Sequence, residues 1–479
     1  MLIRTRMAPS PTGEYHIGGL RTLLYNYALA KKDGGQFIMR IEDTDQKREV
    51  EGAEERLLVV IKDYGLDWDE FYKQSERLDI YKEYAQVLLK NDSAYYCFCT
   101  EERLDQVRKE QQAQGLPRTF YDGKCRGLDK DEAFKRVLAG ESYVIRQKIP
   151  KNEEIVYEDA VLGKITFNTA DLDDSILMKS DGFPTYHLAV VIDDHLMNIT
   201  HILRGIEWLP SVPKHVLLYK AFGWEMPVHA HLPNLKEKGA NKKLSKRFGD
   251  VHAAAFLEKG YLPEAMLNFL MLLGWNPGTE KEIYTLEEFV KDFSIERIHK
   301  TDLVAFDREK LLWFNGYYIR GMSVEDLHKR ILEWSKKFNV SLPEGFVSNS
   351  GQMVLKLIQE RLKTLNEVSG LISYFYEEPS LDMQKLTEFA KDKSAAKEIL
   401  NSFTELFGPL ESWGTKQLDE KAHLLLQEKG YKPKEAFMTL RVAVSGVTAT
   451  PPIFETLEIL GKEKVLTRLK AATYLIDSQ

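Results

Sequence analysis

The chain has 479 residues, of which 43% are hydrophobic and 29% are charged. At ~100–200 residues per domain this length predicts two to four domains, and the composition is that of a folded globular protein rather than a disordered one. The net charge of −7 gives no overall attraction to nucleic acid. A nucleic-acid partner would therefore have to meet a local basic face.

The sequence does not favour a membrane-spanning protein, an exported protein or a small disulfide-stabilised protein. No apolar run approaches the ~18–20 residues that span a bilayer. The stretch 1–6 has neither the apolar centre of a signal peptide nor the Ser/Arg-rich character of a presequence. Three cysteines exclude a disulfide scaffold. We expect a cytoplasmic protein without membrane contact.

The first 64 residues predict a strand–helix–strand unit and a further helix. Residues 2–8 alternate between two faces, which is typical of a strand. The run 18–32 has leucines at helical spacing and ends at Gly34-Gly35. A second strand is predicted over 36–41 and a second helix over 49–64. Strand, helix and strand in this order indicate a parallel sheet.

The pattern of predicted secondary structure changes between residues 95 and 180. Short β-like pieces there, 142–149 and 164–168, alternate with helical ones, which indicates an inserted lobe. Near-continuous apolar runs then predict strands buried on both faces, with a helix behind them. The two strands are predicted over 185–193 and 199–203, and the helix over 211–222.

Beyond residue 250 the pattern is helical. Apolar residues at helical spacing predict a helix over 353–368. The stretch 341–351 is rich in Pro, Gly and Ser and predicts a joint within the helical part. The predicted architecture is an α/β nucleotide-binding domain with an inserted α/β lobe, followed by helical modules.

A first candidate motif, Pro-Ser-Pro-Thr-Gly-Glu-Tyr-His-Ile-Gly-Gly over 9–19, lies between the first strand and the first helix. A helix N-terminus presents free N–H groups and partial positive charge, so it attracts phosphate. Gly18 leaves the backbone open to a nucleotide, and His16 can donate a hydrogen bond to a phosphate oxygen. In isolation, a turn with an incidental histidine is an equally good interpretation.

A second candidate motif is Lys-Lys-Leu-Ser-Lys-Arg over 242–247. The window 236–247 holds six basic residues and one acidic residue. Such a charge run usually marks a solvated loop. The functional alternative is a loop whose lysines meet the β- and γ-phosphates of ATP and stabilise charge as the α-phosphorus is attacked.

Together the two motifs resemble the HIGH and KMSKS motifs of class I aminoacyl-tRNA synthetases. Four further stretches look like those of the bacterial-type glutamyl-tRNA synthetases, and the resemblance covers essentially the whole chain. Glutaminyl-tRNA synthetases carry a different first motif and a β-barrel anticodon domain, which the helical periodicity after 350 contradicts. The four stretches are RMAPSPTG at 6–13, RIEDTD at 40–45, DGFPTYH at 181–187 and DDH at 193–195.

The resemblance implies attachment of L-glutamate to glutamate tRNA in two steps. The α-carboxylate attacks the α-phosphorus of ATP, held with Mg²⁺, and glutamyl-adenylate then transfers glutamate to the 3′ end of the tRNA. The implied partners are glutamate tRNA, L-glutamate and ATP, and we expect a monomer. The nucleophile is ionised at pH 7, so catalysis would be positioning and electrostatics without a general base.

The resemblance also assigns site residues. Charged residues at the carboxyl ends of strands suit glutamate, since arginine grips carboxylates and an acid suits the ammonium group. At two positions, Val190 and Ile206, the chain departs from residues that other family members carry. The implied glutamate site is Arg6, Ser10, Glu42, Tyr186 and Arg204; the ATP site is Gly18, Glu207, Trp208, Asn234, Leu235, Ser245 and Lys246; catalysis is assigned to His16, Lys243 and Lys246.

Two further sites are predicted apart from the glutamate and ATP sites. Cys97, Cys99 and Cys125, with Tyr121, could hold tetrahedral Zn²⁺, because thiolates suit zinc and some family members bind zinc in this lobe. The alternative is three reduced thiols in a former zinc lobe. Arg361 falls on an arginine that reads the third anticodon base; the alternative is a surface arginine lying over Leu357 or Leu365.

Three other functions stay open at this point. The first is a non-discriminating enzyme that also charges glutamine tRNA. The second is a catalytically silent RNA-binding paralogue, and the third is a small-molecule nucleotidylyltransferase. The implied domains are a Rossmann-like catalytic domain in two halves over 1–95 and 185–250, an acceptor-stem-binding lobe over 96–184, a helical stem-contact module over 251–325, and an all-helical anticodon-binding domain over 326–479.

Overall fold

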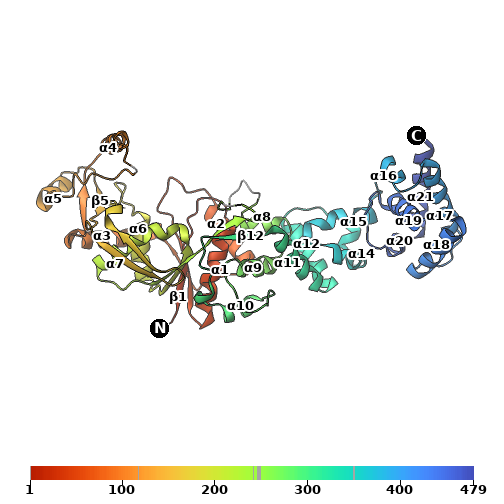
Figure 1. The fold of residues 1–479 in the computed structure, drawn as a ribbon, viewed down its shortest axis with the longest axis horizontal. Coiled ribbons are helices and arrows are strands. Elements are labelled where there is room, and N and C mark those ends of the chain that lie inside the picture. The colour runs from red at the N-terminus through yellow and green to blue at the C-terminus, as the bar shows by residue number, and fades with distance from the viewer. Residues whose placement is uncertain (1, 117, 241, 245–249, 349–350, 479) are drawn as a thin grey trace. The chain divides into compact units, whose positions relative to one another are not determined.

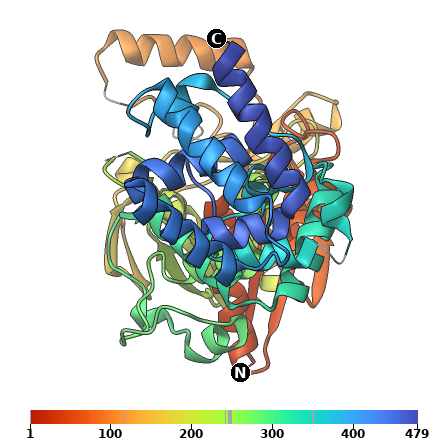
Figure 2. The same ribbon diagram turned by 90° about the vertical axis from the view of Figure 1, so that its right-hand side faces the viewer.

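The computed structural model describes residues 2–116, 118–240, 242–244, 250–348 and 351–478. The chain divides into two compact units, Met1–Phe256 with Pro263–Arg308 and Leu257–Leu262 with Glu309–Gln479. The first unit contains all strands of the described residues, and the second is helical (Figures 1 and 2).

A parallel sheet begins the first unit and confirms the predicted strand–helix–strand start. Strands β1 (Arg4–Met7), β2 (Gln36–Ile41) and β3 (Glu70–Lys73) pair in that order, all parallel. Helix α1 (Ile17–Lys32) connects β1 and β2 and buries one side of the sheet with its leucines. Helix α2 (Ala53–Asp63) follows β2.

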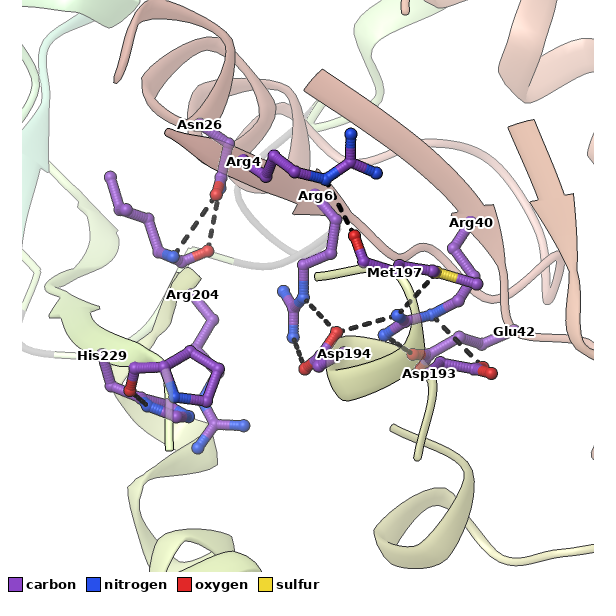
Figure 3. A network of polar contacts seen from close by, with 12 residues as sticks. Arg4, Arg6, Asn26, Arg40, Glu42, Asp193, Asp194, Met197, Arg204 and His229 are labelled. Carbon is purple, nitrogen blue, oxygen red and sulfur yellow. Dashed lines mark hydrogen bonds and ion pairs between the residues drawn. The ribbon is translucent and has the colours of Figure 1, made fainter. Parts of the chain in front are cut away.

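A second parallel pair, β9 (His201–Gly205) and β10 (Val228–Leu232), lies beside β1. The Thr200 N–H donates to the Arg4 carbonyl at 2.9 Å. Farther along β9, the side chain of Asn26 in α1 takes the place of a neighbouring strand, since its Nδ2 donates to the Leu203 carbonyl at 2.9 Å (Figure 3). One helix side chain thus ties α1 to β9 near the carboxyl end of that strand.

The strand predicted over 185–193 is wrong, because this segment forms helix α6 (Tyr186–Leu196). Its residues from Leu188 to Asp194 are all buried, in a core shared with α3 (Leu78–Lys90) and α7 (Val212–Phe222). A helix that is buried all round has the same continuous apolar run as a buried strand. The strand at 199–203 and the helix at 211–222 are confirmed by β9 and α7, within two residues.

The inserted segment combines two antiparallel sheets with short helices. One sheet has the order β4-β5-β8, and the other is the hairpin β6-β7. The Ala160 N–H, in the turn of this hairpin, donates to the His229 carbonyl of β10 at 2.8 Å. This hydrogen bond joins the hairpin to the parallel pair of β9 and β10. The elements are β4 (Ala94–Cys97), α4 (Glu101–Ala113), α5 (Lys130–Leu138), β5 (Val144–Gln147), β6 (Glu154–Asp159), β7 (Gly163–Asn168) and β8 (Ile176–Met178).

The rest of the first unit carries the segment around the second motif. Strand β11 (Asn234–Glu237) pairs parallel with β12 (Leu303–Phe306). The remaining elements are the 3₁₀ turns η1 (Gln74–Arg77), η2 (Thr169–Asp171), η3 (Ile206–Ser211) and η5 (Ile295–Arg297) and the helices α8 (Ala253–Glu258), α9 (Pro263–Met271) and α10 (Leu286–Asp292).

The second unit confirms the helical prediction but not the continuous helix over 353–368. Helix α14 (Gly351–Ile358) ends in the 3₁₀ turn η6 (Gln359–Arg361), and Leu362 is extended. The break ends at a capping box, in which the Glu367 carboxylate accepts the Thr364 N–H at 3.3 Å. The apolar spacing persists across the break because most apolar residues on both sides of it are buried, namely Val354, Leu355 and Ile358 before it and Leu362, Leu365 and Val368 after it.

The remaining helices of the second unit complete its core. None of the helices within the described residues is both long and apolar enough to cross a bilayer. They are α11 (Arg308–Gly321), α12 (Val324–Lys337), α13 (Glu344–Val347), η7 (Leu365–Glu367), α15 (Val368–Tyr376), α16 (Met383–Thr387), α17 (Lys393–Phe407), α18 (Thr415–Lys429), α19 (Pro433–Ser445), α20 (Ile453–Leu460) and α21 (Lys462–Ser478).

Candidate active site

A cavity of about 490 Å³ opens at the carboxyl ends of β1, β2 and β9 in the first unit. This is where ligands bind in parallel α/β sheets. Most of the residues that the sequence assigned to glutamate and ATP line it. They are Arg6, His16, Gly18, Glu42, Tyr186, Arg204, Glu207, Trp208, Asn234, Leu235 and Lys243.

Three predicted site residues are not among those lining residues. Ser10 is exposed in the turn after β1, where its carbonyl accepts the Thr12 N–H at 2.9 Å. Ser245 and Lys246 lie outside the described residues. The cavity therefore brings together the first motif and the start of the second, Lys243 and Leu244.

One wall of the cavity is held by a buried network of charges. Arg6, within β1, donates to Asp194 of α6 at 3.1 Å. Arg40 of β2, which is fully buried, donates to Asp194 at 2.8 Å and to Glu42 at 3.1 Å (Figure 3). Burial works toward a raised pKa of Asp194, but Arg6 and Arg40 outweigh it and hold that pKa below its usual range.

Sequence reasoning assigned no role to Arg40, Asp193 or Asp194. Asp193 accepts hydrogen bonds from Gln74 at 2.9 Å and Tyr81 at 2.8 Å, which joins α6 to the β3–α3 region. The sequence does contain a signal for this buried network, because RIEDTD at 40–45 and DDH at 193–195 place charged residues next to apolar runs. Charged residues inside otherwise apolar runs are rarely buried without a partner.

Arg204 of β9 differs from Arg6 in its surroundings. Its Nε donates to His231 at 3.0 Å and its Nη1 donates to the Tyr186 hydroxyl at 3.2 Å. Its Nη2 is buried and has no hydrogen-bond partner within the part of the chain that the structure describes. Both direct partners are uncharged side chains, so the guanidinium charge is available to an anion in the cavity.

His16 is the N-cap of α1. Its Nδ1 accepts the Gly18 N–H at 2.9 Å, and this hydrogen bond assigns the proton of the ring to Nε2. Burial, assisted by His252 and Lys243, lowers the pKa of His16 to about 4. The neutral ring can therefore donate Nε2–H to a phosphate oxygen at pH 7, beside the N-terminus of a helix.

The segment after the second motif lies directly against the first motif. The Ile17 N–H donates to the Val251 carbonyl at 2.9 Å, and the Ala253 N–H donates to the Tyr15 carbonyl at 2.8 Å. Lys243 pairs with Glu207 at 2.8 Å between side chains that are 53% and 41% exposed. Two motifs more than two hundred residues apart in sequence thus border one cavity.

The cysteines meet in the inserted lobe. The sulfur atoms of Cys97, Cys99 and Cys125 lie within 4.8 Å of one another. The Tyr121 hydroxyl is 3.4 Å from the Cys97 sulfur and 3.5 Å from the Cys99 sulfur. Burial raises the pKa of Cys99 to about 11. Three sulfurs and one oxygen at this separation fit a tetrahedral zinc ion.

Arg361 is exposed at the end of η6 in the second unit. Burial, together with the nearby charge of Arg361, lowers the pKa of Arg441. The Tyr374 hydroxyl is buried and has no hydrogen-bond partner among the described residues. Arg361 therefore lies within electrostatic reach of both Arg441 and Tyr374.

Comparison with known proteins defines the class. Residues 2–313 match the family described as "tRNA synthetases class I (E and Q), catalytic domain", and residues 325–473 match the family described as "Anticodon binding domain". The chain therefore belongs to the class I tRNA synthetases of the E and Q group. This confirms the predicted fold class, a parallel-sheet catalytic domain followed by a helical anticodon-binding region.

Three of the individual relatives are glutamate–tRNA ligases. The chain is 43% identical to the glutamate–tRNA ligase of Finegoldia magna, with 98% of this chain and 99% of that one covered. It is 44% identical to the glutamate–tRNA ligase of Prosthecochloris aestuarii, with 98% and 97% covered. A crystal structure of a glutamate tRNA ligase from Elizabethkingia meningosepticum in complex with its amino acid is similar with a TM-score of 0.88 and 36% identity, covering 99% and 100% of the two chains.

Proposed function

We propose that this chain is a glutamate–tRNA ligase that attaches L-glutamate to glutamate tRNA with ATP. The observation that carries the proposal is the cavity in which Arg204 keeps an unneutralised charge beside His16 at the N-terminus of α1. The relatives named above, which match over nearly the whole length, support it.

In this proposal the amino acid lies between Arg6, Arg204 and Glu42. The two guanidinium groups bind carboxylate, and the Glu42 carboxylate, 9% exposed, faces the ammonium group. Tyr186 assists through its hydroxyl, which already accepts from Arg204. Ser10 contributes from the turn after β1.

ATP lies in this proposal over the N-terminus of α1. Gly18 and the Nε2–H of His16 face its phosphates, and Trp208, Asn234 and Leu235 surround the nucleoside with Glu207. Lys243, Ser245 and Lys246 of the second motif neutralise the charge on the β- and γ-phosphates, which Mg²⁺ shares. Lys243 would exchange its ion pair with Glu207 for the phosphates.

The reaction follows in two steps. The α-carboxylate of glutamate attacks the α-phosphorus, and pyrophosphate leaves with the electron pair of the broken P–O bond. The terminal ribose hydroxyl of the tRNA then attacks the acyl carbon of the mixed anhydride. AMP leaves with the electron pair of the broken C–O bond, and its phosphate takes the hydroxyl proton. The chain's residues position the reactants and stabilise charge. His16 donates a hydrogen bond from Nε2 and does not act as a base, because its Nδ1 already accepts the Gly18 N–H and the attacking carboxylate carries no proton.

ATP–pyrophosphate exchange, measured with and without tRNA, tests this function. Exchange that depends on L-glutamate supports it. A silent RNA-binding paralogue would show no exchange under either condition. A small-molecule nucleotidylyltransferase would form no aminoacyl-tRNA whatever its exchange activity. Glutamine in place of glutamate should give ~10⁴-fold less exchange, because a site built for a specific polar partner rejects the isostere at this level.

We also propose that the enzyme discriminates between glutamate and glutamine tRNAs through Arg361. Glutamate anticodons end in C and glutamine anticodons end in G. The unpaired edge of C offers the O2 and N3 acceptors, which suit a guanidinium, whereas the edge of G presents donors. The exposure of Arg361 beside Arg441 supports this assignment.

We also propose that the inserted lobe binds a structural zinc ion. Cys97, Cys99, Cys125 and Tyr121 would hold it, and it would fix the loops of the inserted lobe without taking part in the reaction. We further propose the four-part domain division predicted from the sequence, with the lobe 96–184 at the acceptor stem. A monomer in the cytoplasm completes the proposal.

A further inference from the structure

A buried Asp–His pair lies behind Arg204, and neither residue lines the cavity. His231 stands opposite Arg204 in the register of β9 and β10. Its Nε2 accepts the Arg204 Nε–H at 3.0 Å, and its Nδ1 lies 2.6 Å from Oδ2 of Asp159. Asp159 ends β6 of the inserted hairpin, so two parts of the first unit meet at this pair.

The hydrogen bonds of Asp159 fix the tautomer of His231. Its Oδ1 accepts the backbone N–H groups of Val161 at 3.0 Å and Leu162 at 2.9 Å, and its Oδ2 accepts the Tyr157 hydroxyl at 2.8 Å. A carboxylate with these donors can only accept from His231. The proton of the ring is therefore on Nδ1, and Nε2 is a free acceptor for Arg204.

The pair also keeps a negative charge out of direct contact with Arg204. Burial outweighs the hydrogen bond to Asp159 and lowers the pKa of His231, so the ring is neutral. Arg6, by contrast, contacts the carboxylate of Asp194 directly. An imidazole between Asp159 and Arg204 orients the guanidinium without neutralising it.

We propose that Asp159 and His231 are positioning residues for Arg204. The carboxylate fixes the imidazole, the imidazole holds Nε of Arg204, and the open Nη2 is left charged for a carboxylate of glutamate. This inference rests on the proposed function for the identity of the substrate. It deepens that function by tying selection of an anionic amino acid to a residue of the inserted lobe.

Two variants of similar volume at position 231 test the proposal. In H231Q the amide oxygen can accept from Arg204 and the amide nitrogen can donate to Asp159, so L-glutamate should bind nearly as in the wild type. H231M has no acceptor, so the dissociation constant for L-glutamate, measured by calorimetry, should rise about tenfold or more. The affinity for ATP should stay the same in both variants.

Asp159→Asn tests the tautomer. The amide oxygen of the variant keeps the two backbone N–H groups as donors, so the amide nitrogen faces Nδ1 of His231. Because that nitrogen is a donor, Nδ1 must accept and the ring proton moves to Nε2. Two N–H groups, Nε2–H of His231 and Nε–H of Arg204, then face each other. L-glutamate binding should weaken about tenfold or more, as in H231M. Tyr157→Phe is the matched control, since it removes a donor from the same carboxylate oxygen without changing the tautomer.

The outcomes separate this inference from the proposed function. Equal glutamate affinity in H231Q and H231M would overturn the inference, as would a wild-type protein that does not bind L-glutamate. Equal losses in H231Q, H231M and Y157F, accompanied by weaker ATP binding, would indicate a structural role and would also overturn it. A wild type that binds glutamate but shows no pyrophosphate exchange would refute the proposed function alone.

Discussion

At the scale of single residues, Asp194 makes the clearest prediction about stability. Its carboxylate joins Arg6 and the fully buried Arg40. Asp194→Asn leaves Arg6 facing a neutral amide, whereas Arg40 keeps Glu42. Breaking a buried pair in this way costs about 3–5 kcal/mol. We expect a lower free energy of unfolding in urea and weaker glutamate binding.

A matched control for this variant is Asp105→Asn on α4. Asp105 pairs with Arg108, and the two side chains are 59% and 60% exposed. Exposed pairs contribute little to stability. Equal effects of the two substitutions on unfolding would contradict the role given to the buried network.

His16 has two separable functions. Its Nδ1 caps α1, so His16→Ala should reduce stability by about 0.5–2 kcal/mol. Loss of the Nε2–H donor should slow pyrophosphate exchange by ~10²–10³. His16→Asn keeps a good cap and should lose only the rate. Full exchange activity in either variant would exclude His16 from the ATP site.

The pH dependence of stability should also report His16. Its pKa is about 4 in the folded chain against an ordinary value of 6.5. The unfolded chain therefore binds a proton first, and the stabilisation is complete above 6.5 and is lost as the pH falls toward 4. The Tm of the wild type should fall more than that of His16→Asn between these pH values. A difference that does not change with pH would disprove the depressed pKa.

At the scale of elements, the sequence predicted the parallel core well and α6 badly. The β1–α1–β2 unit was predictable because each element has one buried face and ends at turn residues. Helix α6 was read as a strand because every residue from Leu188 to Asp194 is buried, which removes the helical period. The cavity residues at strand ends were predictable, but the pair Asp159–His231 was not, since it forms between segments 72 residues apart.

The cysteine cluster of the inserted lobe predicts that the protein binds zinc. Untagged protein should contain about one zinc per chain, held by three thiolates and the Tyr121 oxygen. Cys125→Ser should lose the metal, whereas Tyr121→Phe should keep it but release it faster to a chelator. Metal analysis of the wild type that gives well under one zinc per chain would support the three reduced thiols instead.

At the scale of the whole molecule, the role proposed for Arg361 predicts that the helical unit sets the choice of tRNA. Arg361→Gln should shift the ratio of glutamate tRNA to glutamine tRNA charging toward glutamine tRNA, by an amount equivalent to about 1–3 kcal/mol on the scale known for base recognition. Lys356→Gln removes one exposed charge from α14 and serves as the control. An unchanged ratio in the Arg361 variant would remove this residue from anticodon recognition.

Aminoacylation of the two tRNA transcripts by the purified wild-type protein tests the central claim most directly. With ATP, Mg²⁺ and labelled glutamate, the account predicts efficient charging of glutamate tRNA and little charging of glutamine tRNA. Labelled glutamine should be transferred to neither. Folded protein that charges neither transcript with glutamate would contradict the proposed function, and equal charging of both would contradict discrimination.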